Sequence, residues 1–109
     1  LHLPLDDSTK NIMNEERLQM LKSNAVLINL ARGGLIDEAI LKKILLEKRI
    51  VGAALDVFEI EPPIDKELLT MDNVLITPHI GGSTEEAILA MGLAAIDGLD
   101  NAKDPLEFM

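Results

Sequence analysis

The sequence predicts an α/β fold, as part of a doubly wound and mainly parallel sheet. Three short apolar runs, at residues 25–31, 50–55 and 74–77, are separated by segments whose apolar residues recur with helical spacing. Strands that are buried on both faces form nearly continuous apolar runs. Strands that alternate with helices form right-handed βαβ units, so we expect the three runs to be parallel strands of one sheet.

Helices are predicted at residues 15–22, 37–48 and 84–99, with a short one at 66–71. Asn14 and Asp37 precede the first two and have side chains that cap helix N-termini. Ser83 and Glu86 have the spacing of a capping box for the helix at 84–99. Residues 1–5 are apolar and contain Pro4, which predicts the end of a fourth strand at an edge or terminus of the sheet.

Composition excludes several classes of protein. Hydrophobic residues make up 48% of the 109 residues, which is typical of a globular domain. The net charge of -9 and the two aromatic residues argue against a nucleic-acid partner. No apolar run reaches the roughly 20 residues that cross a membrane. The sequence contains no cysteine, so disulfides and thiolate metal sites are excluded, and we expect no metal site.

Polar side chains follow each of the three predicted strands. Arg32 follows the first, Asp56 and then Glu61 follow the second, and His79 follows the third. Open α/β sheets bind ligands at the carboxyl ends of their strands. A carboxylate and an imidazole there suggest acid–base chemistry. Taken singly, each residue has another explanation: a surface ion pair for the arginine, a turn cap for the histidine and the aspartate, and a loop for Glu61.

Four motifs occur together in the order LHLPLDDST, LINLARGGLIDE, GAALDVFEIEPP and TPHIGGSTEEA. In this combination the sequence resembles the D-isomer-specific 2-hydroxyacid dehydrogenases from Leu1 to about Leu99, and the last motif is most similar to the D-3-phosphoglycerate dehydrogenase branch. The resemblance implies that residues 1–100 are the second half of a Rossmann-like NAD-binding domain and that residues 101–109 are a C-terminal tail. The glycine-rich G-x-G-x-x-G motif is absent, so we expect the chain to be a fragment that lacks the first half. The chain departs from the family at Lys48-Arg49, where a glycine often ends the helix, and after Leu99.

The resemblance also implies roles for individual residues. Arg32 would hold the substrate carboxylate and carbonyl, His79 would be the general acid–base, and Glu61 would be its carboxylate partner. Asp56 would contact the nicotinamide carboxamide. The remaining residues expected to line the cofactor, in addition to Arg32 and His79, are Pro4, Ala31 and Gly81. His2 is interpreted as structural or peripheral to the cofactor.

The expected cofactor is NAD, and NADP stays open because the residues that distinguish the two would precede Leu1. The expected partner is a small 2-hydroxyacid or 2-oxoacid, in a cytoplasmic homodimer. Glyoxylate or hydroxypyruvate reductases and D-lactate dehydrogenases of the same family are alternatives. A dehydrogenase-like NAD-binding corepressor or sensor is a further alternative, which turnover by the full-length protein would distinguish from an enzyme. An inactive fragment is another, which a mass measurement and the upstream reading frame would decide.

Overall fold

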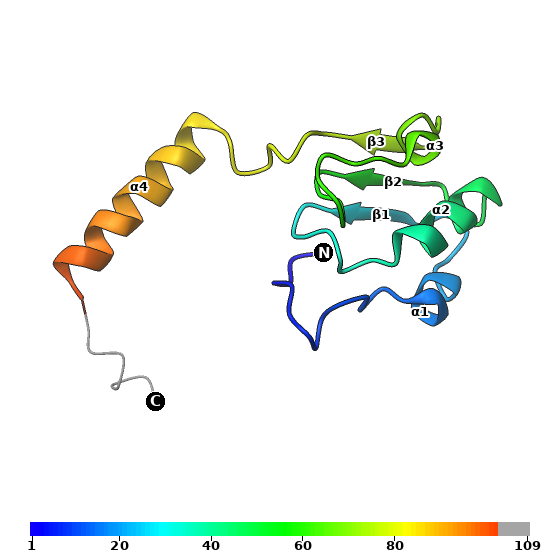
Figure 1. Ribbon diagram of the computed structural model, residues 1–109, viewed down its shortest axis with the longest axis horizontal. Helices are drawn as coiled ribbons and strands as arrows, with labels where there is room; N and C mark the ends of the chain where they lie inside the picture. The colour runs from blue at the N-terminus through cyan, green and yellow to red at the C-terminus, as the bar shows by residue number, and fades with distance from the viewer. Residues whose placement is uncertain (103–109) are drawn as a thin grey trace. The chain divides into compact units, whose positions relative to one another are not determined.

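The computed structural model describes residues 1–102, so most of the predicted tail at 101–109 lies outside the described residues. The chain forms two compact units, Leu1–His79 and Ile80–Met109. Each unit is described by itself. The first contains the sheet and three helices, and the second contains one helix, α4 (Figure 1).

The first unit contains a parallel sheet of three strands in the order β1-β2-β3 (Figure 1). The strands are β1 (Val26–Asn29), β2 (Gly52–Leu55) and β3 (Val74–Ile76). They fall within the three predicted runs, and the parallel pairing confirms the predicted fold class. Parallel pairing brings the three carboxyl ends to the same edge of the sheet, which is where the polar side chains follow.

Three helices of the first unit begin at capped N-termini. They are α1 (Glu15–Gln19), α2 (Glu38–Leu46) and α3 (Lys66–Leu69), and all three were predicted, each with somewhat longer bounds. The Asn14, Asp37 and Asp65 side chains accept hydrogen bonds from the backbone of the first turn of α1, α2 and α3 respectively. The N–H groups of a first helical turn have no partner within the helix, so these side chains fix where each helix begins.

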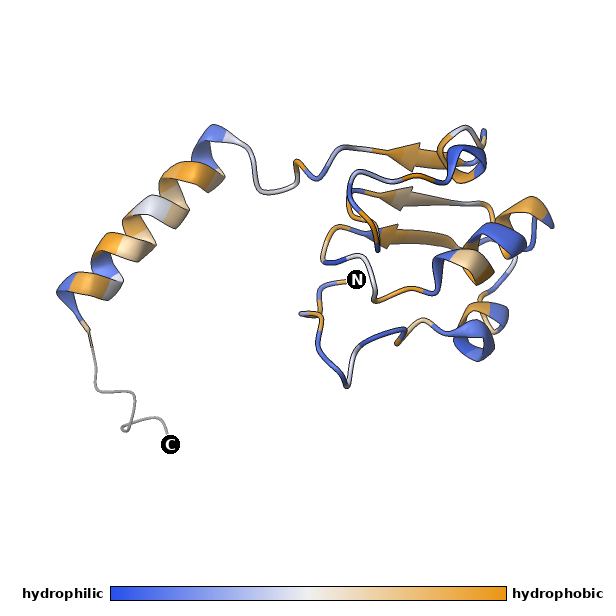
Figure 2. Ribbon diagram, viewed as in Figure 1, coloured by the Kyte–Doolittle hydropathy of each residue, from blue (hydrophilic) through white to orange (hydrophobic). Residues whose placement is uncertain are grey.

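One face of the sheet forms the core and the other is largely bare. Leu27, Ala53 and Val74 are aligned across the three strands and pack into the core cluster with apolar residues of α2. The next row, Ile28, Ala54 and Leu75, lies on the opposite face, where Ile28 is 49% and Leu75 is 67% exposed. The strands are apolar on both faces (Figure 2), as the sequence predicted, although only one face is covered within this unit.

Residues 1–5 do not form the predicted fourth strand. The Leu1 amino group donates a hydrogen bond to the carbonyl of Ile28 in β1, at 2.7 Å. Pro4 has no N–H to donate, and a ladder does not develop beyond that contact.

The second unit contains α4 (Glu85–Asp100), which was predicted with the wrong capping residue. Thr84 is the N-cap, and its side chain accepts a hydrogen bond from the Ala87 N–H at 3.1 Å. The predicted box assigned that position to Ser83, one residue earlier. The large apolar side chains of α4 are more than half exposed, and none of its residues is buried. Among residues 1–102, no helix has the length and apolarity that a membrane span requires.

Candidate active site at the carboxyl ends of the strands

Glu61 and His79 form a hydrogen-bonded pair after β2 and β3. The distance between His79 Nδ1 and Glu61 Oε2 is 2.6 Å, which confirms the predicted contact. An ionised carboxylate only accepts hydrogen bonds, so Nδ1 is the donor in this contact and Nε2 is the ring nitrogen that takes no part in it. Glu61 Oε1 accepts a second bond from the Phe58 N–H at 3.0 Å. The bond from His79, and after it the bond from Phe58, hold the pKa of Glu61 below its usual value.

The backbone at His79 has a conformation that the sequence did not reveal. Its φ is 54°, in the left-handed region that few residues other than glycine occupy. The His79 N–H donates to the Thr77 carbonyl at 3.1 Å across a tight turn at Pro78. Backbone strain of this kind is concentrated at functional sites. The Glu61–Pro62 peptide bond in the partner loop is cis.

Arg32 lies in the turn that follows β1, and Asn29 holds that turn. The Asn29 side chain is buried, accepts a hydrogen bond from the Ala31 N–H at 3.1 Å and donates to the Arg32 carbonyl at 2.8 Å. The guanidinium of Arg32 is exposed, and its Nη1 donates to the Ala31 carbonyl at 2.7 Å. The arginine therefore has a fixed backbone and a side chain at the surface.

Arg32, Glu61 and His79 line one hollow of about 430 Å³, here called the Arg32 hollow. The pair at His79 also lines a second hollow, of about 650 Å³, on the β3 side. This second one is called the Asp56 hollow, because Asp56 lies in its wall together with mostly apolar side chains. The structure thus brings the three predicted catalytic residues to one place at the carboxyl ends of the strands.

The residues predicted to line a cofactor lie in both hollows and beyond them. Asp56 is 2% exposed, and its Oδ1 accepts a 2.5 Å hydrogen bond from the Thr77 hydroxyl. Pro4 and Ala31 line a third hollow of about 630 Å³, which Arg32 also lines. His2 is exposed in the wall of that third hollow. Gly81 belongs to the second unit and is exposed there.

Comparison with known proteins identifies the family. Residues 1–81 match the family model of the D-isomer specific 2-hydroxyacid dehydrogenase, NAD binding domain. The chain belongs to this family. Its three parallel strands, and the Glu61–His79 pair after them, lie within the residues that match the NAD-binding domain of this family.

Relatives include enzymes with different substrates. The chain is 55% identical over 92 residues to a D-3-phosphoglycerate dehydrogenase of Methanocaldococcus jannaschii, covering 84% of this chain and 18% of that protein. The structure is similar to the crystal structure of a glyoxylate reductase from Paecilomyes thermophila, with a TM-score of 0.87 and 37% sequence identity. That match covers 94% of this chain and 31% of the glyoxylate reductase chain. The chain is 38% identical to the NAD complexed form of a D-isomer specific 2-hydroxyacid dehydrogenase from Lactobacillus delbrueckii ssp. bulgaricus, with a TM-score of 0.76, covering 96% and 37% of the two chains. The chain thus spans about a fifth to a third of the length of these relatives.

Several residues that shape this part of the dehydrogenase domain were missed in the sequence. Asn29 is a polar residue inside an apolar run, and such a residue signals a hydrogen-bonding duty at a strand end. Thr77 holds Asp56, and Glu38 accepts a bond from the loop that carries Glu61. Gly33 also belongs to this group, because a Cβ there would lie 1.9 Å from the Phe58 carbonyl oxygen.

Proposed function

We propose that this chain is the second half of the NAD-binding domain of a longer NAD-dependent oxidoreductase. The enzyme would transfer a hydride between the nicotinamide and a D-2-hydroxyacid/2-oxoacid pair. The observation that carries the proposal is the 2.6 Å contact between Glu61 and His79 in the hollow that Arg32 also lines. An acid–base pair beside a guanidinium is what the reduction of a charged ketone requires.

Arg32 and His79 would divide the work on the substrate. The Arg32 guanidinium matches a planar carboxylate with two parallel hydrogen bonds, once it turns from the Ala31 carbonyl toward the hollow. His79 would donate the proton from Nε2 to the substrate carbonyl oxygen during reduction, and would accept it back during oxidation. Negative charge develops on that oxygen as the ketone is reduced, so the proton stabilises the transition state.

Glu61 would keep the imidazole in its working state. Its carboxylate accepts from Nδ1–H, which orients the ring and leaves Nε2 for the substrate. Because the Phe58 N–H holds the other carboxylate oxygen, Glu61 presents Oε2 to the histidine at a fixed position.

The residues around the hollows fit the nicotinamide end of a dinucleotide. The Asp56 hollow has mostly apolar walls, as a ring-binding site requires, and Asp56 supplies the kind of acceptor that a carboxamide N–H₂ needs. The Thr77 hydroxyl would orient that carboxylate. Pro4, Ala31 and Gly81 would line the cofactor through their backbone or small side chains. A bound nicotinamide supplies or accepts the hydride.

For the substrate, we propose 3-phosphoglycerate, in view of the TPHIGGSTEEA motif and the 55% identity to a D-3-phosphoglycerate dehydrogenase. Glyoxylate or hydroxypyruvate is the second candidate, favoured by the close structural match to a glyoxylate reductase. The oxidation product of 3-phosphoglycerate, glyoxylate and hydroxypyruvate all carry the 2-oxoacid group that Arg32 and His79 would contact. Discrimination between them would fall to residues outside this chain.

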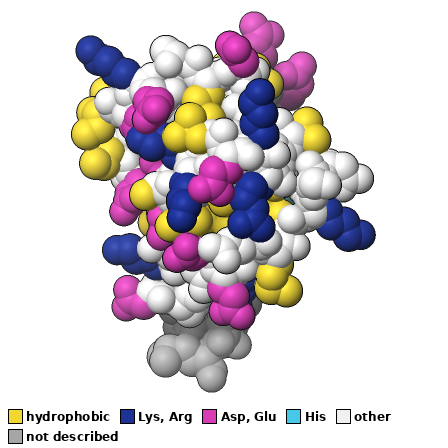
Figure 3. Space-filling view, turned by 90° about the vertical axis from the view of Figure 1, so that its right-hand side faces the viewer, with side chains coloured by type: hydrophobic (Ala, Val, Ile, Leu, Met, Phe, Trp, Pro, Cys, Tyr) yellow, Lys and Arg dark blue, Asp and Glu magenta, His cyan; other side chains and the backbone are white. Residues whose placement is uncertain are grey.

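A cytoplasmic homodimer is part of the same proposal. The bare face of the sheet exposes Ile28 and Leu75, and α4 exposes a further set of large apolar side chains. Large exposed apolar surfaces are typical of interfaces. On the side shown in Figure 3, by contrast, acidic and basic side chains are interspersed, as on a solvated surface. Sedimentation of the full-length protein and cell fractionation would test these two points.

The experiment that tests the function is a substrate panel with the purified full-length protein. Oxidation of 3-phosphoglycerate and reduction of glyoxylate, hydroxypyruvate and pyruvate would be followed by nicotinamide absorbance, each with NAD(H) and NADP(H). We expect turnover of at least one of these pairs. A folded full-length protein that binds NAD but turns over none of them would support the sensor alternative and contradict the enzyme.

A further inference from the structure

We propose that Glu38, at the start of α2, is a positioning residue for the loop from Phe58 to Glu61 and therefore for the Glu61–His79 pair. The importance of this pair in catalysis rests on the proposed function, whereas the positioning itself can be measured without any activity. Glu38 bonds to the Glu59 N–H, whereas His79 bonds to Glu61. Glu38 would act through the backbone of the loop.

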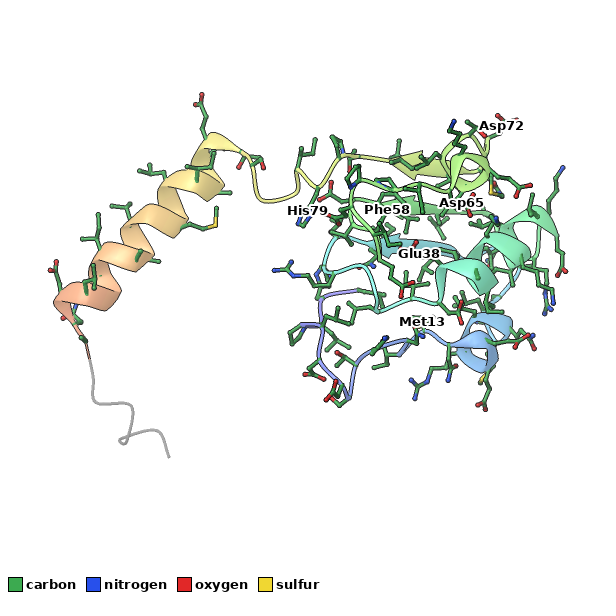
Figure 4. The ribbon with its side chains drawn as sticks, in the orientation of Figure 1. Met13, Glu38, Phe58, Asp65, Asp72 and His79 are labelled. Carbon is green, nitrogen blue, oxygen red and sulfur yellow. The ribbon has the colours of Figure 1, made fainter. Side chains whose placement is uncertain are left out.

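The first observation is a hydrogen bond between α2 and the loop. Glu38 Oε1 accepts from the Glu59 N–H at 2.6 Å, across 21 residues of sequence. Figure 4 shows Glu38 and Phe58 in the same region of the first unit, with His79 nearby at the carboxyl ends of the strands. A bond from a backbone N–H to an ionised carboxylate is about twice as strong as a bond between neutral groups. The loop is thus tied to the helix two residues before Glu61.

The second observation is the sequence of bonds that continues from this tie. The Phe58 N–H, next to Glu59, donates to Glu61 Oε1 at 3.0 Å, and Glu61 Oε2 contacts His79 Nδ1 at 2.6 Å. Displacement of the Glu59 backbone would therefore move the Phe58 N–H as well. Both bonds that hold the Glu61 carboxylate would then lengthen.

The third observation is that Glu38 is retained at an electrostatic cost. Burial, followed in effect by the nearby carboxylates of Glu59, Asp65 and Glu61, raises the pKa of Glu38, and the bond from the Glu59 N–H opposes this. Nearby negative charges disfavour the ionised form of Glu38, and the hydrogen bond from the Glu59 N–H offsets part of this cost. The same surrounding provides a test, because a mere charge and a positioning group have opposite effects on Glu61.

The test compares two conservative variants, Glu38→Asp and Glu38→Gln. The Asp variant keeps the charge but withdraws the carboxylate by about 1.5 Å, the length of one C–C bond, which takes it out of hydrogen-bonding range of the Glu59 N–H. The Gln variant keeps an acceptor oxygen at the original reach but removes the charge. The pKa of Glu61 is measured in the 109-residue chain from the ¹³C shift of its carboxyl carbon against pH. Glu61→Gln assigns the signal, and the amide spectrum verifies folding.

Positioning predicts that Glu38→Asp raises the pKa of Glu61 toward the ordinary value, while Glu38→Gln lowers it or leaves it unchanged. It also predicts that the bond to Glu38 shifts the Glu59 amide proton downfield in the wild type and in the Gln variant, and that this shift is lost in the Asp variant. If the Asp variant changes neither the pKa of Glu61 nor the Glu59 amide shift, the proposal is wrong. In that case, a lowered pKa of Glu61 in the Gln variant would show that Glu38 acts on Glu61 only through its charge. In the full-length protein, Glu38→Asp should lower kcat by up to about 100-fold, with Glu38→Gln near wild type. Displaced NMR signals in a protein that turns over no 2-oxoacid would contradict the proposed function and leave the positioning intact.

Discussion

Replacing Gly33 with Ala should separate the Arg32 turn from the loop that carries Glu61. The new Cβ would lie 1.9 Å from the Phe58 carbonyl oxygen and 2.5 Å from the Glu59 nitrogen. Real Cβ contacts shorter than 3.0 Å essentially do not occur, and the atoms in the way are backbone atoms that cannot rotate aside. The loop must therefore move by about 1 Å or more, at a cost of about 1–3 kcal/mol in the free energy of unfolding.

The assay has two parts. Chemical denaturation of the 109-residue chain measures the loss of stability, and ¹³C NMR measures the pKa of Glu61, which we expect to rise as its bonds from His79 and Phe58 lengthen. In the full-length protein, a misplacement of about 1 Å would reduce kcat by about 100-fold. Gly98→Ala is the matched control, because among residues 1–102 no atom lies within 4 Å of its added Cβ apart from its chain neighbours and the backbone of its own helix; that variant should leave the pKa of Glu61 unchanged. Unchanged stability and an unchanged pKa for Gly33→Ala would refute the close approach.

Three further predictions concern stability. Lys48 has a left-handed backbone conformation, with φ of 52°, at the end of α2, where its N–H and that of Arg49 donate hydrogen bonds back to the helix. Lys48→Gly should therefore stabilise the chain by about 1 kcal/mol in urea denaturation. A destabilised variant would contradict this conformation. Thr84→Ala should cost about 1 kcal/mol of α4 stability by circular dichroism, while Ser83→Ala should cost little. A larger loss for Ser83→Ala than for Thr84→Ala would show that Ser83 is the N-cap, as the predicted capping box required. Burial raises the pKa of Glu38, so the folded state loses stability relative to the unfolded state as pH rises above about 4.5. Glu38→Gln should therefore melt higher relative to wild type at pH 7 than at pH 4, and a difference independent of pH would contradict the raised pKa.

Much of the fold was predictable because each element has a local signal. Continuous apolar runs predicted the strands, and Asn14 and Asp37 predicted where α1 and α2 begin. The exceptions have local physical causes. Pro4 has no N–H to donate to a strand ladder at the N-terminus. Ser83 and Thr84 can both cap a helix, and in the structure Thr84 is the N-cap. Sequence alone could not decide between adjacent residues of equal capacity.

The positions of Arg32, Glu61 and His79 at the strand ends were predictable, and the contacts that support them were not. Arg32, Glu61 and His79 follow the ends of strands, so parallel pairing was sufficient to bring them together. The tie from Glu38 to Glu59 spans 21 residues, and the close approach of Gly33 to Phe58 involves backbone atoms. Neither leaves a periodic or spacing signal in the sequence. Contacts of this kind depend on the completed fold.

The role of His79 is the central claim, and single-turnover kinetics of a His79→Asn variant of the full-length protein test it most directly. Asparagine tolerates the left-handed backbone at this position, so the variant should keep the turn after β3. It cannot supply the proton. We predict that reduction of the 2-oxoacid slows by about 10²–10⁴-fold, while the dissociation constant for NADH changes little. A near-wild-type rate of reduction by a folded His79→Asn variant would contradict the account.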